Sequence, residues 1–274
     1  MRFTLATLAI LAACAQTPAD EPASAPPSVL RFEMQTREMT YGDCVAGSES
    51  CTYVRLDYPT VVEAPPGTAV AAVTSAIDSF LAAPLHPDDP PAGVNALMAR
   101  FLADFAEFKA AEPKSAQSWF LERKAFVLRS ASNLLSLSFS ERSYLGGAHG
   151  LGVVHYLNLD PATGAKKALV DLLREGALPE ATRLAEAGFR ETRGIAEGVS
   201  FADAGFTFEN GTFVLTDNCA LRDDGLACTY NAYDVAPYSM GATEIVLRTE
   251  EIRELLRPEY ASQTGTTSAP QREQ

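Results

Sequence analysis

Four of the five cysteines in this chain fall into two close pairs, and their spacing constrains the fold more than any other feature. Six residues separate Cys44 from Cys51, and eight separate Cys219 from Cys228. Four cysteines allow three disulfide pairings. Pairing within each close pair is the simplest, because both intervals are rich in turn-forming residues, and each bond would stabilise the fold by roughly 2–3 kcal/mol. The competing interpretations, a zinc site or a redox centre, are disfavoured because neither pair has the Cys-x-x-Cys spacing.

The fifth cysteine, Cys14, ends a leader that is typical of exported bacterial lipoproteins. Arg2 precedes an apolar run over residues 5–11, and small residues lead up to the cysteine. The run is too short for a permanent membrane-spanning helix. We therefore expect a mature protein anchored to a membrane by acyl chains on Cys14. This predicts a periplasmic location in the cell envelope, at the outer membrane of a bacterium that has two, because Ala15 rather than Asp follows the cysteine. That compartment is oxidising, which suits the disulfides.

The charge of the chain excludes some partners. The 274 residues carry a formal net charge of −13, and loss of Arg2 with residues 1–13 makes it −14. Such acidity argues against nucleic-acid binding, because phosphates would be repelled. It also disfavours adhesion to anionic lipid head groups, so membrane attachment would depend on the lipid. A basic protein partner would be attracted, although many proteins are acidic for solubility alone.

Changes in composition divide the chain into five segments. An Ala- and Pro-rich stretch after Cys14 predicts a flexible tether, and a final stretch with almost no apolar residues predicts a disordered tail. The segments are a signal peptide (1–13), the tether (14–28), an N-terminal α+β subdomain (29–145), a C-terminal α+β subdomain (146–258) and the tail (259–274).

Hydrophobic periodicity predicts an α+β fold in which antiparallel sheets pack against helices. Apolar residues recur at helical spacing over 94–108, and a second helix that Thr68 would cap carries an apolar face up to residue 81. Leu135, Leu137 and Phe139 alternate with serines, as in a half-buried antiparallel strand. The remaining expected strands are 30–41, 52–58, 119–129, 153–159, 206–208, 213–216, 226–231 and 244–248; the remaining helices are 170–173, 178–190 and one that starts at 249.

Several short segments, in their order along the chain, resemble a known bacterial family. They are Tyr144–Gly150 (YLGGAHG), Tyr156–Asp160 (YLNLD), Tyr233–Tyr238 (YDVAPY) and Glu244–Leu247 (EIVL). Together they resemble the paired extracytoplasmic domains of unknown function that occur in the RsiV anti-sigma factor ectodomain and in the non-catalytic part of PdaC, a peptidoglycan deacetylase. The resemblance covers about residues 30–257 and implies an α+β fold like the RsiV ectodomain.

The resemblance implies a binding role rather than an activity. The anti-sigma factor binds lysozyme outside the membrane and signals through a spanning helix, which we do not expect here. Deacetylation belongs to a separate metal-dependent domain that needs an Asp and a closely spaced His pair. Only His86, His149 and His155 occur in this chain, without a matching acidic motif. We therefore expect no catalytic residues, no metal and no cofactor, and a lysozyme-like muramidase or peptidoglycan as partner.

The candidate binding residues are His149, Tyr233, Tyr238 and Met240. The tyrosines and Met240 surround Pro237 in a loop, where they would either anchor a partner or close the end of a sheet. His149 lies in a glycine-rich turn and has a structural alternative, fixing that turn, while His155 should face the core. Three functions remain open: a non-enzymatic binding module on a lipoprotein, an envelope enzyme that uses the His149 region, and a structural lipoprotein without a ligand. The sequence does not indicate an oligomeric state.

Overall fold

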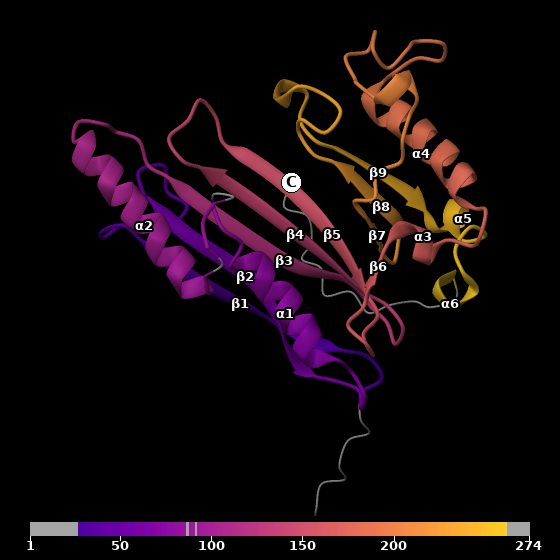
Figure 1. The fold of residues 1–274 in the computed structure, drawn as a ribbon, viewed down its shortest axis with the longest axis horizontal. Coiled ribbons are helices and arrows are strands. Elements are labelled where there is room, and N and C mark those ends of the chain that lie inside the picture. Colours follow the sequence, from indigo (N-terminus) through magenta and orange to yellow (C-terminus); the bar gives the residue numbers. More distant parts are fainter. Residues whose placement is uncertain (1–26, 86–87, 91, 262–274) are drawn as a thin grey trace, which may run out of the picture.

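The computed structural model describes residues 27–85, 88–90 and 92–261, so the predicted leader, Cys14, His86 and most of the tail lie outside the described residues. The described chain forms two α+β subdomains that lie side by side (Figure 1). We define them by their sheets as an N-terminal subdomain, residues 27–167, and a C-terminal subdomain, residues 168–261. The predicted fold class, antiparallel sheets packed with helices, is confirmed.

The N-terminal subdomain is built on a six-stranded sheet in the order β1-β2-β3-β4-β5-β6. All neighbours pair antiparallel except β2 and β3, which run parallel. Helices α1 and α2 form the crossover that the parallel pair requires. The bounds are β1 Arg31–Thr40, β2 Tyr53–Glu63, α1 Val70–Leu81, α2 Val94–Ala111, β3 Phe120–Ser130, β4 Leu135–Tyr144, β5 Leu151–Leu159 and β6 Lys166–Lys167.

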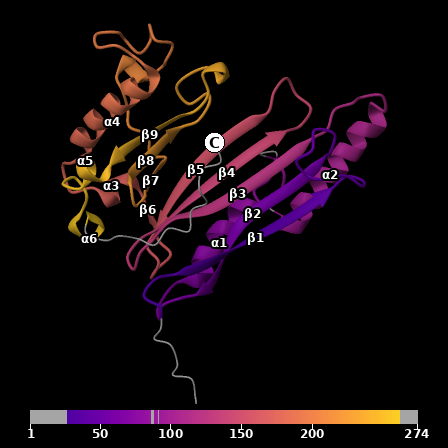
Figure 2. The same ribbon diagram turned by 180° about the vertical axis from the view of Figure 1, so that it is seen from behind.

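Both helices lie on one face of this sheet, as the two opposite views show (Figures 1 and 2). Val73 and Ile77 of α1 and Phe101 of α2 are buried against the apolar residues of β2, β3 and β4. The helical stripe over 94–108 and the alternation over 135–139 are therefore confirmed. Thr68 does not cap α1 as expected; its hydroxyl donates to the carbonyl of Pro65, and Ala69 takes the capping position.

A buried arginine holds the end of α1 against the sheet. The side chain of Arg123 on β3 is 2% exposed. Its Nη1 lies 2.9 Å from the carbonyl oxygen of Leu81 and 2.7 Å from that of Ala83. Its Nε donates to Glu141 on β4 at 2.8 Å. The helix end thus has donors for carbonyls that lack partners within the helix.

The C-terminal subdomain has a three-stranded antiparallel sheet in the order β7-β8-β9, with α4 packed against it (Figure 1). Its core is aromatic. Phe189 of α4 lies with its ring centroid 5.0–5.9 Å from five other rings, those of Phe201, Phe206, Phe208, Phe213 and Tyr230. The bounds are α3 Leu169–Leu172, α4 Leu178–Arg193, β7 Cys219–Leu221, β8 Gly225–Tyr230, β9 Thr243–Arg248, α5 Thr249–Ile252 and α6 Pro258–Ala261.

The structure differs from the sequence-based expectation in three further respects. Residues 206–208 and 213–216 are not strands but irregular segments, because Phe206, Phe208 and Phe213 pack around Phe189 rather than pair in a ladder. The three-residue strand β7 was not predicted. The expected division at 145/146 falls inside the first sheet, since β4 and β5 pair along their length, and sheet pairing places the division after β6.

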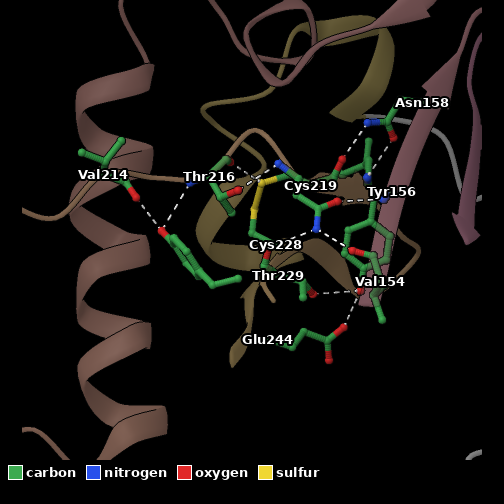
Figure 3. The surroundings of a disulfide bond; sticks show 12 residues. Val154, Tyr156, Asn158, Val214, Thr216, Cys219, Cys228, Thr229 and Glu244 are labelled. Carbon is green, nitrogen blue, oxygen red and sulfur yellow. Dashed lines mark hydrogen bonds between the residues drawn. A yellow bond between two sulfur atoms is a disulfide. The ribbon is translucent and has the colours of Figure 1, made fainter. Parts of the chain in front are cut away.

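Both predicted disulfides are present. Cys44–Cys51 closes the connection between β1 and β2. Cys219–Cys228 joins β7 to β8 at a directly paired position, and both of its cysteines are buried (Figure 3).

Three asparagines join the two subdomains along the outer edge of β5. The amide groups of Asn218 and Asn231 each accept from a β5 backbone N–H, those of Tyr156 and Val154, at 2.8 and 2.7 Å. Both amides also donate to the Val154 carbonyl. Asn158 of β5 donates in turn to the carbonyl of Cys219, beside the disulfide (Figure 3). Side-chain amides thus take the place of a neighbouring strand along this edge.

Candidate binding site

Three of the four candidate residues lie together where the turn between β4 and β5 meets the loop between β8 and β9. The rings of His149 and Tyr238 stack with centroids 3.8 Å apart and planes 16° apart. The ring of Tyr233 lies 5.7 Å from that of Tyr238, and its hydroxyl is 3.4 Å from Nε2 of His149. We call His149, Tyr233 and Tyr238 the aromatic cluster.

Hydrogen bonds fix the stacked pair on the β4–β5 turn. The Tyr238 hydroxyl donates to the carbonyl of Gly150 at 2.6 Å, and Nδ1 of His149 lies 2.9 Å from the same oxygen. The turn itself needs a glycine at Gly146, where φ is +81° and a Cβ would lie 2.7 Å from Nε1 of Trp119. The cluster therefore rests on a turn whose backbone conformation requires glycine at this position.

Tyr233 is both strained and exposed. Its φ is +76°, a left-handed conformation that costs an ordinary residue about 1–2 kcal/mol. Its side chain is nevertheless 60% exposed, so burial does not offset this cost. Two local bonds hold the backbone: the Tyr233 N–H donates to the Ala236 carbonyl, and the Asn231 N–H donates to Asp234. Strain that persists at an exposed aromatic residue is a feature of functional loops.

Met240 lies apart from the aromatic cluster and packs on the C-terminal core. Its sulfur lies beside Gly205, 3.4 Å from where a Cβ would be if that residue had one. Arg193, at the end of α4, fixes this part of the loop. Its guanidinium donates to the carbonyls of Met240 and Ala242 at 2.9 Å and to the hydroxyl of Thr243 at 2.7 Å. Sequence reasoning missed Arg193, because no local pattern links a helix end to a loop nearly fifty residues later.

His155 is not buried in the core, contrary to the expectation. It lies on β5 opposite Phe139, on the helix side of the sheet as expected, but its side chain is exposed. The stripe shared with Val153 and Leu157 indicated the correct face but not how far the helices extend over it. Within residues 27–85, 88–90 and 92–261, no three His, Cys, Asp or Glu side chains are grouped so that they could hold a metal ion.

Two carboxylates on the strands, Asp57 and Glu244, have structural partners. Asp57 accepts from Thr36 and pairs with Arg55. Glu244 pairs with Arg222 at 3.2 Å and accepts from the Tyr156 hydroxyl at 2.8 Å. Burial, together with the negative charge of Glu244, raises the pKa of Tyr156 to about 12.

A cavity that the sequence did not indicate lies between the subdomains and has a volume of about 210 Å³. Arg129 of β3, Arg222 and Arg253 line it together with Asp223, whose carboxylate is 3.9 Å from Arg129. Burial lowers the pKa of Arg129. These residues come from three separate stretches of chain, so no sequence motif groups them.

No helix in the part of the chain that the structure describes is long and apolar enough to cross a membrane.

Part of the sequence matches a protein-family model, and about half of it is similar to a known protein. Residues 170–250 match the family model described as a protein of unknown function, DUF3298. Over 136 residues, 49% of this chain, the sequence is 23% identical to the peptidoglycan-N-acetylmuramic acid deacetylase PdaC of Bacillus subtilis (strain 168). The match spans only 28% of the length of PdaC.

Two crystal structures show the same fold. A DUF3298 family member from Bacteroides fragilis NCTC 9343 is similar with a TM-score of 0.61 at 20% identity, and a DUF3298 family protein from Pseudomonas aeruginosa PAO1 with a TM-score of 0.60 at 21% identity. Each similarity covers 84% of this chain and 96% of the other chain. Residues 170–250 are therefore similar to the DUF3298 family model, and the α+β fold is similar to that of crystal structures of DUF3298 family proteins.

Proposed function

We propose that this protein is a non-enzymatic binding module of the bacterial cell envelope and that acyl chains on Cys14 anchor it to a membrane. The aromatic cluster of the module contacts a lysozyme-like muramidase. The observation that carries the proposal is Tyr233, an exposed ring held in a strained conformation beside a stacked pair of rings.

The aromatic cluster has the properties of an interaction anchor. Tyrosine contributes a large amphipathic contact area with few rotatable bonds, and energetic hot spots of interfaces are enriched in it. Tyr238 is fixed by its bond to Gly150, and the Tyr233 loop is fixed by its own backbone bonds. Little conformational entropy would be lost on binding, because these groups are already ordered.

One further fact supports the choice of partner, and another supports the alternative ligand. The net charge of −13 would steer a basic muramidase toward the protein. The similarity to PdaC, whose name gives it a substrate in peptidoglycan, favours peptidoglycan itself as the alternative ligand.

The test measures binding of the full chain, carrying Cys14→Ser, to a basic lysozyme by calorimetry at two salt concentrations. We expect binding that weakens as salt rises, and a loss of at least about tenfold in affinity for Tyr233→Ala. Tyr233→Gly should lose affinity equally while raising stability, since glycine accepts φ +76°. Val170→Ala, at another exposed apolar residue, is the matched control and should bind normally.

Sedimentation with purified peptidoglycan tests the alternative ligand in parallel. Absence of binding to both ligands at high micromolar concentration would refute the proposal. Turnover of peptidoglycan fragments that disappears in a folded His149→Ala variant would show instead that the protein is an enzyme.

A further inference from the structure

The two long edges of the six-stranded sheet differ in whether their backbone groups have hydrogen-bond partners. Asparagine side chains satisfy the edge of β5, whereas among the described residues β2 is the only strand that pairs with β1. β1 is ten residues long and contains no proline. An open edge of this kind presents a row of backbone donors and acceptors to another strand.

The hydrogen-bond pattern identifies which backbone groups face outward. The Tyr41 N–H donates to the Thr52 carbonyl directly opposite, in continuity with the β1–β2 register. Bonded and non-bonded pairs alternate along an antiparallel ladder. The odd-numbered residues of β1 from 33 to 39 therefore bond β2, and the N–H and C=O groups of Met34, Thr36 and Glu38 point to the open edge.

The side chains of β1 carry charges that are complementary about the strand centre. Glu33 and Arg37 both lie on the helix side of the sheet, two residues either side of Gln35. Arg37 donates to the neutral amide of Asn95, and within the described chain neither Glu33 nor Arg37 has an ion-pair partner. Met34 and Met39 on the same strand are 44% and 40% exposed.

We propose that β1 pairs antiparallel with β1 of a second copy of this chain, about a twofold axis through Gln35. In this register Glu33 of each copy lies opposite Arg37 of the other, so two ion pairs form. Met34 lies opposite Thr36, and these positions exchange the outward-facing backbone bonds. A symmetric interface requires self-complementary contacts of this kind. The proposal does not depend on the function proposed above.

Charge on an edge strand ordinarily prevents pairing, so the register decides the outcome. Two allowed registers neighbour this one: a register centred on Met34, which places Arg31 opposite Arg37, and a register centred on Thr36. The register centred on Thr36 would place Gln35 opposite Arg37 and Met34 opposite Glu38, and it would form no ion pair between these residues. The charges therefore favour the register centred on Gln35 over the neighbouring registers.

Charge reversal tests the interface in the full chain with Cys14→Ser, by sedimentation at up to about 100 µM protein. The unsubstituted chain should form dimers, and Glu33→Arg or Arg37→Glu alone should weaken dimerisation roughly ten- to thirtyfold by placing like charges opposite each other. Mixing the two variants should restore association, because each supplies the charge that the other needs. Glu38→Arg, on the same strand, and Asn95→Ala, which removes only the contact to Arg37, should leave dimerisation unchanged.

Cross-linking tests the register. Gln35→Cys should form a disulfide between copies on mild oxidation, because directly opposed residues of a non-hydrogen-bonded pair lie about 4.5 Å apart, whereas Thr36→Cys should not. A chain that stays monomeric at about 100 µM would overturn the proposal, whether a segment of its own chain or nothing covers the edge. Efficient cross-linking through Thr36→Cys, or failure of the mixed variants to associate, would overturn it equally.

Discussion

The two subdomains bury their cores by different means. In the N-terminal subdomain, the apolar faces of α1 and α2 pack on a six-stranded sheet, and most of the buried residues there are aliphatic. In the C-terminal subdomain, phenylalanines from irregular segments gather around Phe189, and a disulfide fastens a three-stranded sheet beside them. Regular elements thus supply one core, whereas single aromatic residues supply much of the other. The second core should therefore depend far more on individual side chains.

The largest effect is expected for Phe189→Ala. The ring contacts five others and is fully buried, so its loss should lower the free energy of unfolding by about 3–5 kcal/mol. Chemical unfolding followed by circular dichroism measures the change. The comparison in the N-terminal core is Ile77→Val on α1, which removes one buried methyl group and should cost only about 0.5–1.5 kcal/mol. A loss below about 2 kcal/mol for Phe189→Ala would contradict the central role of this ring.

The same difference explains how much of the fold could be predicted. The stripe over 94–108 and the alternation over 135–139 repeat at the period of the element they form, so the sequence indicates both element and buried face. Phe206 and Phe208 also alternate, as do Phe213 and Leu215, but their spacing reflects burial in an aromatic core and not strand pairing. β7 is too short to carry a period of its own.

The candidate site shows the same limit. Tyr233 and Tyr238 are close in sequence and could be named together, and the glycine-rich turn drew attention to His149. Their contact across 84 residues depends on the asparagine bonds at β5, which no local pattern reveals. The left-handed backbone of Tyr233 and the bonds that Arg193 makes to the loop follow from tertiary structure alone.

The two disulfides should differ in how much they contribute to the free energy of unfolding, although they close loops of similar length. Replacing Cys219 and Cys228 by alanine should cost about 3–4 kcal/mol, since it removes a cross-link worth roughly 2–3 kcal/mol and also leaves a cavity in a buried site. Replacing Cys44 and Cys51 should cost less, because Cys44 is partly exposed and only Cys51 is buried. Thermal and chemical unfolding of the two double variants measures both. Equal losses would show that burial adds nothing to the C-terminal cross-link.

A smaller effect is expected at the junction. Asn218→Ala removes an acceptor from the Tyr156 N–H and donors from the carbonyls of Val154 and Thr229. The loss should be about 1–3 kcal/mol, because the part-buried Tyr156 N–H loses the Asn218 acceptor, whereas the Val154 carbonyl keeps its bond from Asn231.

The junction variant also tests whether the subdomains unfold together. Trp119 packs on Phe105 and Phe108 in the N-terminal subdomain, so its fluorescence reports on that region alone. In the unsubstituted protein, fluorescence and circular dichroism should give one transition. In Asn218→Ala the two transitions should separate, and coincident transitions would show that other contacts couple the subdomains. Asn95→Ala, which removes an exposed side-chain amide on α2, is the control.

The smallest effect at neutral pH is expected for Tyr156→Phe, which removes the hydroxyl that donates to Glu244 and accepts from Thr229, and should cost about 0.5–1.5 kcal/mol. Its signature is at high pH. Burial raises the pKa of Tyr156 to about 12, above its value of about 10 in an unfolded chain. Between pH 10 and 12 the unfolded state therefore releases the proton that the folded state retains, so stability falls as pH rises. Tyr156→Phe should reduce this slope.

Tyr53 provides the matched test in the N-terminal subdomain. Burial and a hydrogen bond to Glu122 raise its pKa to about 12 as well, so Tyr53→Phe should reduce the slope by a similar amount. Urea unfolding at several pH values from about 8 to 12 measures both variants. If the subdomains unfold as one unit, each substitution changes the pH dependence of a single shared transition. If Tyr53→Phe alters only the transition seen by Trp119, and Tyr156→Phe only the other, the asparagine junction is too weak to couple the two cores.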